Sequence, residues 1–391
     1  MSKYISEHFY KYVAGTSDAP MGVEIERASG MHLYASSGKR YLDMIAGISV
    51  CNMGHAHPAI VEAVKKQAER YMHVMVYGEL IQEPQVELAT LLCEQLPSQL
   101  SSAYFVNSGA EAVEGAMKLA KRLTGRRKIL HCRQSYHGCT QGALSVMGSD
   151  DFKKAFQPLL PEIDSIGFGV IEDLEKITPE TACFIVEPIQ GEAGIRIASR
   201  SYWKAVRERC NETGTLLIFD EIQTGLGRTG RLFCFEHYDV VPDILLLAKA
   251  LGGGMPLGAF ISSKENMKAL THDPMLGHMT TFGGHPVSCA AALAHLKLIL
   301  ENKMWENANE QGAKLENILK DIHGVREIRR MGLMMAVDFH NEHLNMKTYK
   351  RWLHSGIFID WFLFCNTALR IAPPLIINDL DINEFAELIY M

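Results

Sequence analysis

The sequence predicts an α/β fold in which helices cover both faces of a mainly parallel sheet. Two observations point to this class. Short apolar runs without polar alternation recur through the middle of the chain, and segments with the 3.6-residue period of a helix separate them. Strands this apolar are buried on both faces, as is typical of parallel sheets in α/β proteins.

The alternation of helices and strands begins near residue 58, and before it residues 1–50 read as short strands and turns. Apolar periodicity predicts the type of each element, and glycine, proline and small polar residues set its ends. We expect helices over 58–71, 110–123 and 202–212, and strands over 102–107, 128–132, 181–188, 215–221, 243–249 and 257–263.

The C-terminal part of the chain has a different pattern. Two long helical segments, over 288–302 and 305–322, are followed by a strand over 332–339. A further helix and a closing strand around 368–374 come after them. This order is typical of a smaller α+β domain, and chain ends commonly lie close together. We therefore expect a large domain over 51–285 and a small domain built from 1–50 together with 286–391.

Composition limits the classes of partner and the compartment. A net charge of −6, with Lys and Arg spread along the chain, gives no basic surface for nucleic acid. Nine scattered cysteines without a CxxC pair argue against a disulfide framework or a zinc ribbon, and the N-terminus lacks the apolar run of a signal peptide. Residues 244–263 have the length of a membrane span, but Lys249, three glycines and Pro256 oppose one. We expect a cytoplasmic protein that does not enter a membrane.

A polar turn follows the strand expected at 102–107. Ser108 and Glu111 have the spacing of a capping box at the start of the next helix. The same residues also suit an anion site, because the N–H groups of Gly109 and Ala110 and the Ser108 hydroxyl would face a phosphate at the positive end of the helix. Spacing alone does not separate a structural cap from a phosphate site.

Two carboxylates end the strand expected at 215–221. Asp220 and Glu221 are consecutive, so their side chains point to opposite faces and cannot form a glycosidase pair. Residues 225–230 read GLGRTG and match GxGxxG. They do not directly follow the strand and no helical pattern comes after them, so a dinucleotide site is not expected here.

Lys249 stands where the apolar pattern of residues 244–248 predicts another core residue. Lysine is rarely buried without a partner, and burial lowers the pKa of its amine, which makes it a nucleophile. The alternative is a lysine that reaches solvent beside the glycine turn. An anion site, a strand-end aspartate and a buried amine together match the needs of pyridoxal phosphate for its phosphate, its pyridine nitrogen and its aldehyde.

Eight motifs then appear in one order along nearly the whole chain: GHAHPAI, NSGAEA, YHG, EPIQGEAG, FDEIQTGLGRTG, LLAKALGGGMPLGA, TTFGGHP and LRIAPPL. With them the sequence resembles the class III, or ornithine-type, aminotransferases of the fold type I pyridoxal-phosphate enzymes. The resemblance implies a large domain with a mainly parallel seven-stranded sheet, a smaller α+β domain from both chain ends, and a homodimer with a shared active site.

The resemblance also implies roles for single residues. Lys249 would form the imine with the cofactor aldehyde and then move the proton between Cα and the cofactor, and Asp220 would keep the pyridine nitrogen protonated. The other cofactor-binding residues implied are Gln223 at the ring hydroxyl, Tyr136 and Ile222 on the two ring faces, Ser108, Gly109 and Ala110 at the phosphate, and Thr281 from the partner subunit. No metal is expected, and His55 and His57 of GHAHPAI are interpreted as loop structure.

For the substrates, the resemblance implies Arg370, Glu192 and Thr280. Arg370 would bind an α-carboxylate in a bidentate manner, and Glu192 would cover it while an ω-amine donor is bound; a fixed structural ion pair is the alternative. Relatives acting on acetylornithine or 4-aminobutyrate usually carry arginine where this chain has Cys139, and a thiol cannot replace a guanidinium. Either another cation such as Arg133 replaces it, or the donor lacks a carboxylate at that end.

These observations predict a transaminase with ping-pong kinetics. It would move an amino group from an ω-amino donor, ornithine-like, acetylornithine-like or a related amine, to 2-oxoglutarate. A pyridoxal-phosphate enzyme of another reaction type, such as an aminomutase, an epimerase or a decarboxylase, is the alternative that the same motifs leave open.

Overall fold

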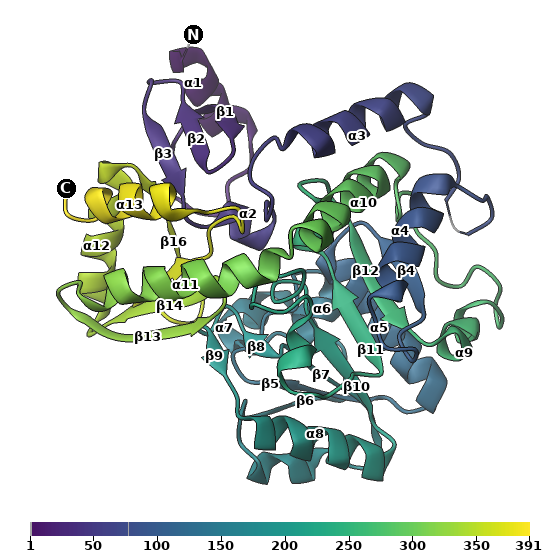
Figure 1. Cartoon of the computed structure of the whole chain (residues 1–391). Coiled ribbons are helices and arrows are strands. Elements are labelled where there is room, and N and C mark those ends of the chain that lie inside the picture. The colour runs from purple at the N-terminus through teal and green to yellow at the C-terminus, as the bar shows by residue number, and fades with distance from the viewer. Residues whose placement is uncertain (1, 77) are drawn as a thin grey trace.

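A seven-stranded sheet forms the middle of the protein (Figure 1). The computed structural model describes residues 2–76 and 78–391. All neighbouring strands are parallel except β12, which is antiparallel to both of its neighbours, so the predicted mainly parallel sheet is confirmed. The strand order is β4 (Ser102–Val106), β12 (Gly258–Ser262), β11 (Ile244–Leu247), β10 (Leu216–Asp220), β7 (Thr181–Val186), β5 (Lys128–Cys132), β6 (Ile163–Ile166).

The five inner strands of this sheet are buried on both faces, which explains the apolar runs. In β11, Ile244 and Leu246 belong to the core that includes α5 (Gly109–Thr124), whereas Leu245 and Leu247 belong to the core on the other face. The second core also contains Trp203 of α8 (Arg200–Thr213), which lies at the bottom of Figure 1. Because successive side chains of a strand point to opposite faces, each position of β11 must be apolar.

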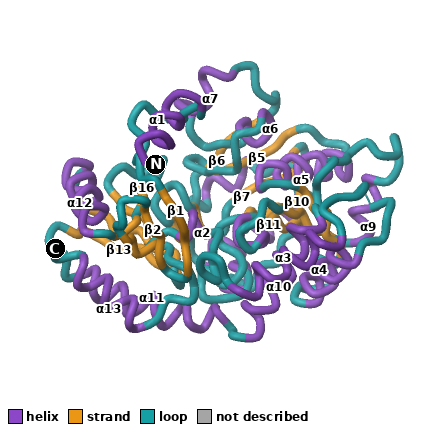
Figure 2. The backbone as a smooth tube through the Cα atoms, turned by 90° about the horizontal axis from the view of Figure 1, so that it is seen from above, coloured by secondary structure: helices purple, strands orange, loops and turns teal. Residues whose placement is uncertain are grey.

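Two smaller sheets are built from the chain ends. The first has the order β1 (Ile25–Ser29), β2 (His32–Ala35), β3 (Arg40–Asp43), β15 (Ile357–Phe358), and the second β13 (Val325–Met331), β14 (Met334–Phe339), β17 (Ala368–Ile371), β16 (Asp360–Trp361). The parallel pair β3 and β15 joins the N-terminal strands to the C-terminal segment. Seen from above, the strands of the small sheets form a group separate from the large sheet (Figure 2).

Helices surround the small sheets and connect them to the large one. The helices α11 (Met304–Lys320), α12 (Glu342–Ser355) and α13 (Asp379–Leu388) pack beside the small sheets. The helix before them, α10 (Pro286–Glu301), packs against α3 (Pro58–Arg70) and α4 (Glu83–Glu94). A boundary at residue 286 therefore remains a proposal, since α10 has its main contacts with elements N-terminal to that point.

The expectation of strands and turns throughout residues 1–50 is wrong at the N-terminus, where residues 2–12 form the helix α1 (Ser2–Tyr12). Rings one turn apart contact each other there: the centroids of Tyr4 and His8 are 3.9 Å apart, and those of His8 and Tyr12 are 5.4 Å apart. Such pairs at i, i+4 stabilise a helix that buries few side chains.

Residues 244–263, the segment with the length of a membrane span, form β11, a glycine-rich turn and β12. Within residues 2–76 and 78–391, no helix combines the length and apolar character that crossing a membrane requires.

Candidate active site

A cavity of about 560 Å³ lies where the carboxyl ends of the parallel strands meet. Its size is within the range of small-molecule sites, and this edge of an α/β sheet is where ligands collect. Much of the wall comes from the segments that follow five strands: Asn107–Ala110 after β4, Tyr136–Cys139 after β5, Glu187 after β7, Asp220 and Ile222–Thr224 at the end of β10, and Lys249 after β11.

Lys249 is in this wall, in a backbone conformation that residues with side chains rarely adopt, with φ 45°. It begins the short 3-10 helix η4 (Lys249–Gly252), and Gly253 follows with φ 59° so close to His295 that a β-carbon there would lie 2.8 Å from the His295 Cβ. Burial lowers the pKa of the Lys249 amine, and the carboxylates of Glu192 and Asp220 only partly oppose this effect. Lys249 as a whole is half-buried, but its amine is desolvated, and its role as a nucleophile stays a prediction.

Asp220 is held by two donors. Its Oδ2 lies 2.7 Å from Nδ1 of His137, and its Oδ1 accepts from the Ile222 N–H at 3.1 Å. Both side chains of the Asp220–His137 pair are buried. The sequence reasoning missed His137; the YHG motif contained it, but only Tyr136 of that motif was given a role. A buried carboxylate fixed in this way suits a cationic ring nitrogen.

Glu221 points away from the cavity, as its place beside Asp220 on the strand predicts. Its carboxylate accepts from the N–H groups of Cys234 and Phe235, at 2.6 and 2.7 Å, and burial raises its pKa to about 8. Residues 225–230 form turns rather than the start of a helix, so the arrangement that a dinucleotide would need is absent from this described loop.

The start of α5 faces the cavity with Ser108, Gly109 and Ala110. Ser108 is the N-cap, and its hydroxyl accepts from the Glu111 N–H at 3.2 Å. The Glu111 carboxylate accepts from the N–H of Asn107, at 2.9 Å, one residue before the position that a capping box requires. The free N–H groups of a helix start, together with a hydroxyl, are a fitting cradle for a phosphate.

Gln223, Ile222 and Tyr136 also line the cavity. Nε2 of Gln223 is buried and has no hydrogen-bond partner within the described chain, so a donor is available to an oxygen of a bound molecule. Ile222 packs against the start of α5, where a β-carbon on Gly109 would come within 2.8 Å of its Cδ1. An apolar side chain and an aromatic ring are thus available to hold a planar group.

Glu192 and Arg370 form a buried ion pair. Oε1 of Glu192 lies 2.6 Å from Nη2 of Arg370, whose side chain is 1% exposed. The other carboxylate oxygen accepts from the Leu363 N–H at 3.1 Å. Nε and Nη1 of Arg370 are buried without a hydrogen-bond partner among the described residues. Glu192 is part of the cavity wall, and Arg370 lies behind it.

Thr280 and Thr281 are not brought to the cavity wall of their own chain. Thr280 lines a second hollow, and its hydroxyl accepts from Nδ2 of Asn107, at 2.9 Å, which does belong to the first wall. Thr281 is exposed on the surface. The role of Thr281 at the cofactor of a partner subunit and the role of Thr280 in substrate binding, both implied by the family resemblance, are therefore proposals.

His55 and His57 have structural contacts. Nε2 of His55 lies 2.6 Å from Oδ2 of Asp43, and His57 caps α3 by accepting from the Ala59 N–H at 3.3 Å. No group of three or more His, Cys, Asp or Glu side chains placed to hold a metal ion occurs in the described parts of the chain.

Cys139 is exposed at the cavity, and its Sγ lies 3.4 Å from the Tyr136 hydroxyl. Arg133 does not line the cavity; it pairs with Asp173 at 3.3 Å and is half exposed. Of the described residues in the cavity wall, Lys249 is the only lysine or arginine.

Comparisons with known proteins identify the family of the chain. Residues 12–390 match the family model for class-III aminotransferases. The chain is 43% identical to the acetylornithine aminotransferase of Methanocaldococcus jannaschii, over 91% of this chain and 89% of that protein. It is 40% identical to the LysW-aminoadipate semialdehyde/glutamate semialdehyde transaminase of Sulfolobus acidocaldarius, over 81% and 82% of the two chains.

Solved structures of transaminases share the fold. An (S)-enantioselective omega-transaminase from Thermomicrobium roseum has a TM-score of 0.92 at 31% identity, covering 100% of this chain and 97% of that one. The ornithine aminotransferase of Toxoplasma gondii, described with partial occupancy of pyridoxal phosphate at its active site, has a TM-score of 0.91 at 30% identity, with 100% and 93% covered.

The chain belongs to the class-III aminotransferases. It is a pyridoxal-phosphate-dependent enzyme of fold type I, and the residues of the cavity fit this cofactor: the unpartnered Gln223 amide, the held Asp220 carboxylate, the desolvated Lys249 amine and the start of α5 are complementary to different parts of it. When bound, the cofactor supplies an aldehyde and an electron-accepting ring.

Proposed function

We propose that this aminotransferase moves an amino group from an ω-amino donor to 2-oxoglutarate in two half-reactions of a ping-pong mechanism. The observation that carries the proposal is the 2.6 Å pair between Glu192 and Arg370 at the cavity wall. When Glu192 pairs with Arg370, the two charges cancel and the site accepts an amine. When Glu192 turns away, the Arg370 guanidinium can bind the α-carboxylate of glutamate or 2-oxoglutarate.

The roles of the other side chains follow from their chemistry. Lys249 would hold the cofactor and would then take and return the proton at the substrate carbon that bears the amino group, which its lowered pKa favours. Asp220, supported by His137, binds the protonated ring nitrogen, and Gln223 donates to the ring oxygen. Ser108, Gly109 and Ala110 bind the phosphate, and Tyr136 and Ile222 enclose the ring.

We propose further that the end of the donor that reaches Cys139 carries no carboxylate. The pairing of Arg133 with Asp173, away from the cavity wall, favours this alternative over replacement of the missing arginine by Arg133. A carboxylate beside Cys139 would gain no cationic partner from the described wall, and any water that it gave up there would be an uncompensated cost. Amines with an uncharged or cationic far end avoid this cost.

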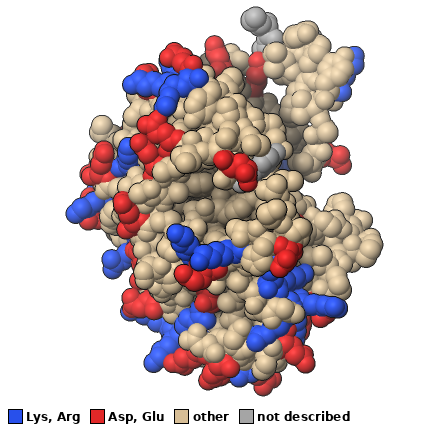
Figure 3. Space-filling view, turned by 90° about the vertical axis from the view of Figure 1, so that its right-hand side faces the viewer, with Lys and Arg blue, Asp and Glu red and all other residues tan. Residues whose placement is uncertain are grey.

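A homodimer with a shared active site is also proposed, in which Thr281 reaches the cofactor phosphate of the partner. Residues 78–82 and 271–285, two connections between helices, expose apolar side chains such as Ile81, at 95%, and Met275, at 79%. They lie on the side of the protein that Figure 3 presents, where broad uncharged areas separate groups of Lys, Arg, Asp and Glu. Such a surface is typical of an interface.

For the location of the protein we propose the cytoplasm, because a reducing compartment suits nine free thiols.

Half-reaction spectra with a panel of donors test the proposed function. 1,4-Diaminobutane, N-acetylornithine, ornithine, 4-aminobutyrate and glutamate are each mixed with the holoenzyme, and the loss of the aldehyde chromophore is followed, then its return on adding 2-oxoglutarate. We expect conversion by glutamate and by at least one ω-amine. No conversion with any ω-amine, or no return with 2-oxoglutarate, would contradict the proposal.

Replacing Lys249 by alanine tests the mechanism separately. Turnover should be lost while far-UV circular dichroism and the oligomeric state stay unchanged, because one side chain at a cavity wall contributes little to the core. Hydride trapping with added pyridoxal phosphate should label Lys249 in the native enzyme and give no label in the variant. Activity close to native in Lys249→Ala would refute the role of this amine.

A further inference from the structure

The loop that carries Glu192 is fixed along its backbone. It connects the two short strands β8 (Ile189–Gln190) and β9 (Arg196–Ile197). At its start the Gly191 N–H donates to Oε2 of Glu187 at 2.9 Å. In its middle the carbonyl of Glu192 accepts from the Phe364 N–H at 3.1 Å. At its end the carbonyl of Gly194 accepts from Nε of Arg329 at 2.6 Å.

Arg329 and Arg370 lie in one row of the small sheet. Arg329 of β13 pairs with Ala336 of β14, which in turn pairs with Arg370 of β17. Residues in register on adjacent strands project from the same face. The two arginines therefore approach the loop from one side, Arg370 contacting the Glu192 side chain and Arg329 contacting the Gly194 carbonyl.

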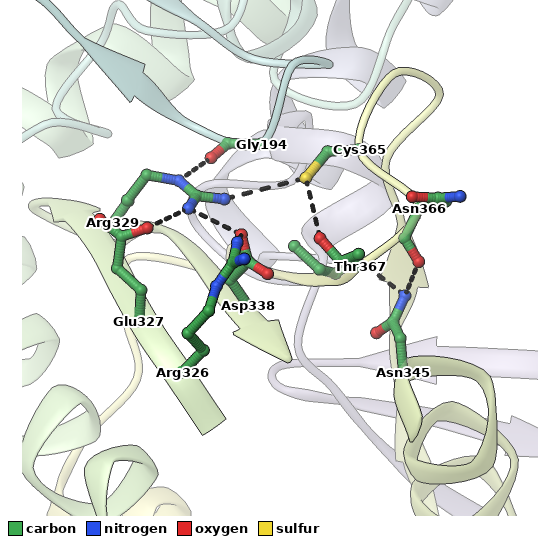
Figure 4. Close-up of polar contacts among 10 residues, drawn as sticks. Gly194, Arg326, Glu327, Arg329, Asp338, Asn345, Cys365, Asn366 and Thr367 are labelled. Carbon is green, nitrogen blue, oxygen red and sulfur yellow. Dashed lines mark hydrogen bonds and ion pairs between the residues drawn. The ribbon is translucent and has the colours of Figure 1, made fainter. Parts of the chain in front are cut away.

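The guanidinium of Arg329 is itself held in place (Figure 4). Its Nη1 lies 2.8 Å from Oδ2 of Asp338, a carboxylate that is 3% exposed, and its Nη2 lies 3.8 Å from Sγ of Cys365. Gly194 packs so closely against it that a β-carbon would come within 2.9 Å of the Arg329 Nη2. Gly194 also has φ 87°, a conformation that favours glycine.

We propose that Arg329 is a positioning residue that sets substrate specificity by fixing the 191–194 loop so that Glu192 covers Arg370. This inference rests on the proposed function of the pair Glu192–Arg370. Arg329 does not line the cavity, and its contact in the loop is a backbone carbonyl two residues beyond Glu192, so it acts through the loop.

The contacts define what moves when the acceptor binds. Turning the Glu192 side chain away from Arg370 breaks two hydrogen bonds, one to Arg370 Nη2 and one to the Leu363 N–H. The backbone bonds made by Gly191, Glu192 and Gly194 do not need to break. The switch is therefore a rotation of one side chain on a fixed loop, and a loose loop would leave Arg370 uncovered for part of the time.

Arg329→Lys tests this assignment, with Arg326→Ala as the matched control. A lysine can keep the charge opposite Asp338 but cannot hold Asp338 and the Gly194 carbonyl at once as a planar fork does. Arg326 pairs with the same oxygen of Asp338, at 2.9 Å, but among the described residues it forms no hydrogen bond or ion pair with the 191–194 loop. Half-reaction rates are measured by stopped-flow spectroscopy with 1,4-diaminobutane, N-acetylornithine and glutamate.

We expect Arg329→Lys to slow the ω-amine half-reaction about tenfold and the glutamate half-reaction less than about twofold, because small misplacements at a reacting centre are costly. Arg326→Ala should leave both rates unchanged. Glu192→Ala should show the same split more strongly, and adding Arg329→Lys to it should change neither rate further, since the two residues act through one contact.

The outcomes separate this inference from the proposed function. Equal losses of both half-reactions in Glu192→Ala, or no reaction with either amine in the native enzyme, would overturn the proposed switch and the role of Arg329 with it. A split in Glu192→Ala without one in Arg329→Lys would overturn the role of Arg329 alone. Thermal unfolding of each variant is the check on folding; if Arg329→Lys does not fold, Gly194→Ala, which crowds the same contact, is judged by the same split and the same double variant.

Discussion

Nδ1 of His137 lies 2.7 Å from Oδ2 of Asp220, and both side chains are buried beside the cavity. An ionised carboxylate only accepts hydrogen bonds, so Nδ1 is assigned as the protonated nitrogen. His137 thereby fixes the orientation of the carboxylate that we place at the cofactor ring nitrogen, as second partners of ligating groups commonly do.

His137→Phe should therefore weaken catalysis by removing one of the two donors that hold the Asp220 carboxylate. Of its two donors among the described residues, Asp220 would keep the Ile222 N–H. We expect kcat to fall by roughly ten- to a hundredfold and the cofactor to dissociate faster, measured by steady-state rates and by loss of the bound chromophore on dilution. His137→Asn, which retains a donor, should lose less. Native kcat in His137→Phe would contradict this role.

Cys139→Arg should change which donors are accepted. A guanidinium at this exposed position would pair with a distant carboxylate, and a charge-assisted hydrogen bond contributes enough to lower KM roughly tenfold for 4-aminobutyrate or ornithine. Cys139→Ser keeps a neutral group and serves as the control. An unchanged KM for carboxylate-bearing donors in Cys139→Arg would show that the donor end does not reach this position.

Gly258→Ala should displace Ser108 at the start of α5, where we propose that the cofactor phosphate binds. A β-carbon on Gly258 would overlap the carbonyl group of Ser108, the N-cap of α5. We expect overpacking to lower the free energy of unfolding by about 1–3 kcal/mol and to weaken cofactor binding, measured by chemical denaturation and cofactor titration. Gly252→Ala is the matched control, since its β-carbon would meet Leu257 at an ordinary 3.5 Å. Equal behaviour of the two variants would contradict the steric argument.

The pair His55–Asp43 predicts a dependence of stability on pH. Burial alone would lower the pKa of His55, but the hydrogen bonds and charges of Asp43 and Cys51 together outweigh burial and raise this pKa to about 10. A raised histidine pKa stabilises the folded state fully below the ordinary value of 6.5, and this contribution is lost as pH rises towards 10. His55→Gln should therefore unfold more easily than the native chain at neutral pH, with the difference shrinking at alkaline pH. A difference that stays constant across this range would contradict the pKa shift.

The sequence was most informative where chemistry and local pattern coincide. Lys249 interrupts an apolar run and Asp220 ends one, so the sequence alone predicts that both lie at strand ends. His137 could not, because its role depends on Asp220, 83 residues further along the chain. The same holds for Arg329, whose contact at Gly194 spans 135 residues and has no local signature.

Some elements were also hidden from the pattern. The strand β6, with the sequence IDSI, lies at the edge of the large sheet, where a partly exposed strand needs no continuous apolar run. The helix α1 exposes most of its described side chains. A helix that buries so few residues does not need apolar residues at a 3.6-residue period, so the sequence pattern does not reveal it.

The parallel pair of β3 and β15 joins residues that are more than 300 positions apart, Leu42 beside Ile357. During synthesis β3 leaves the ribosome long before β15 is made. The edge of β3 that pairs with β15 therefore lacks hydrogen-bond partners until the chain is almost complete. Pairing over such a span is slow, so the N-terminal strands are among the last parts of the protein to reach their final place. Shortening the chain before residue 357 would leave that edge open to other chains.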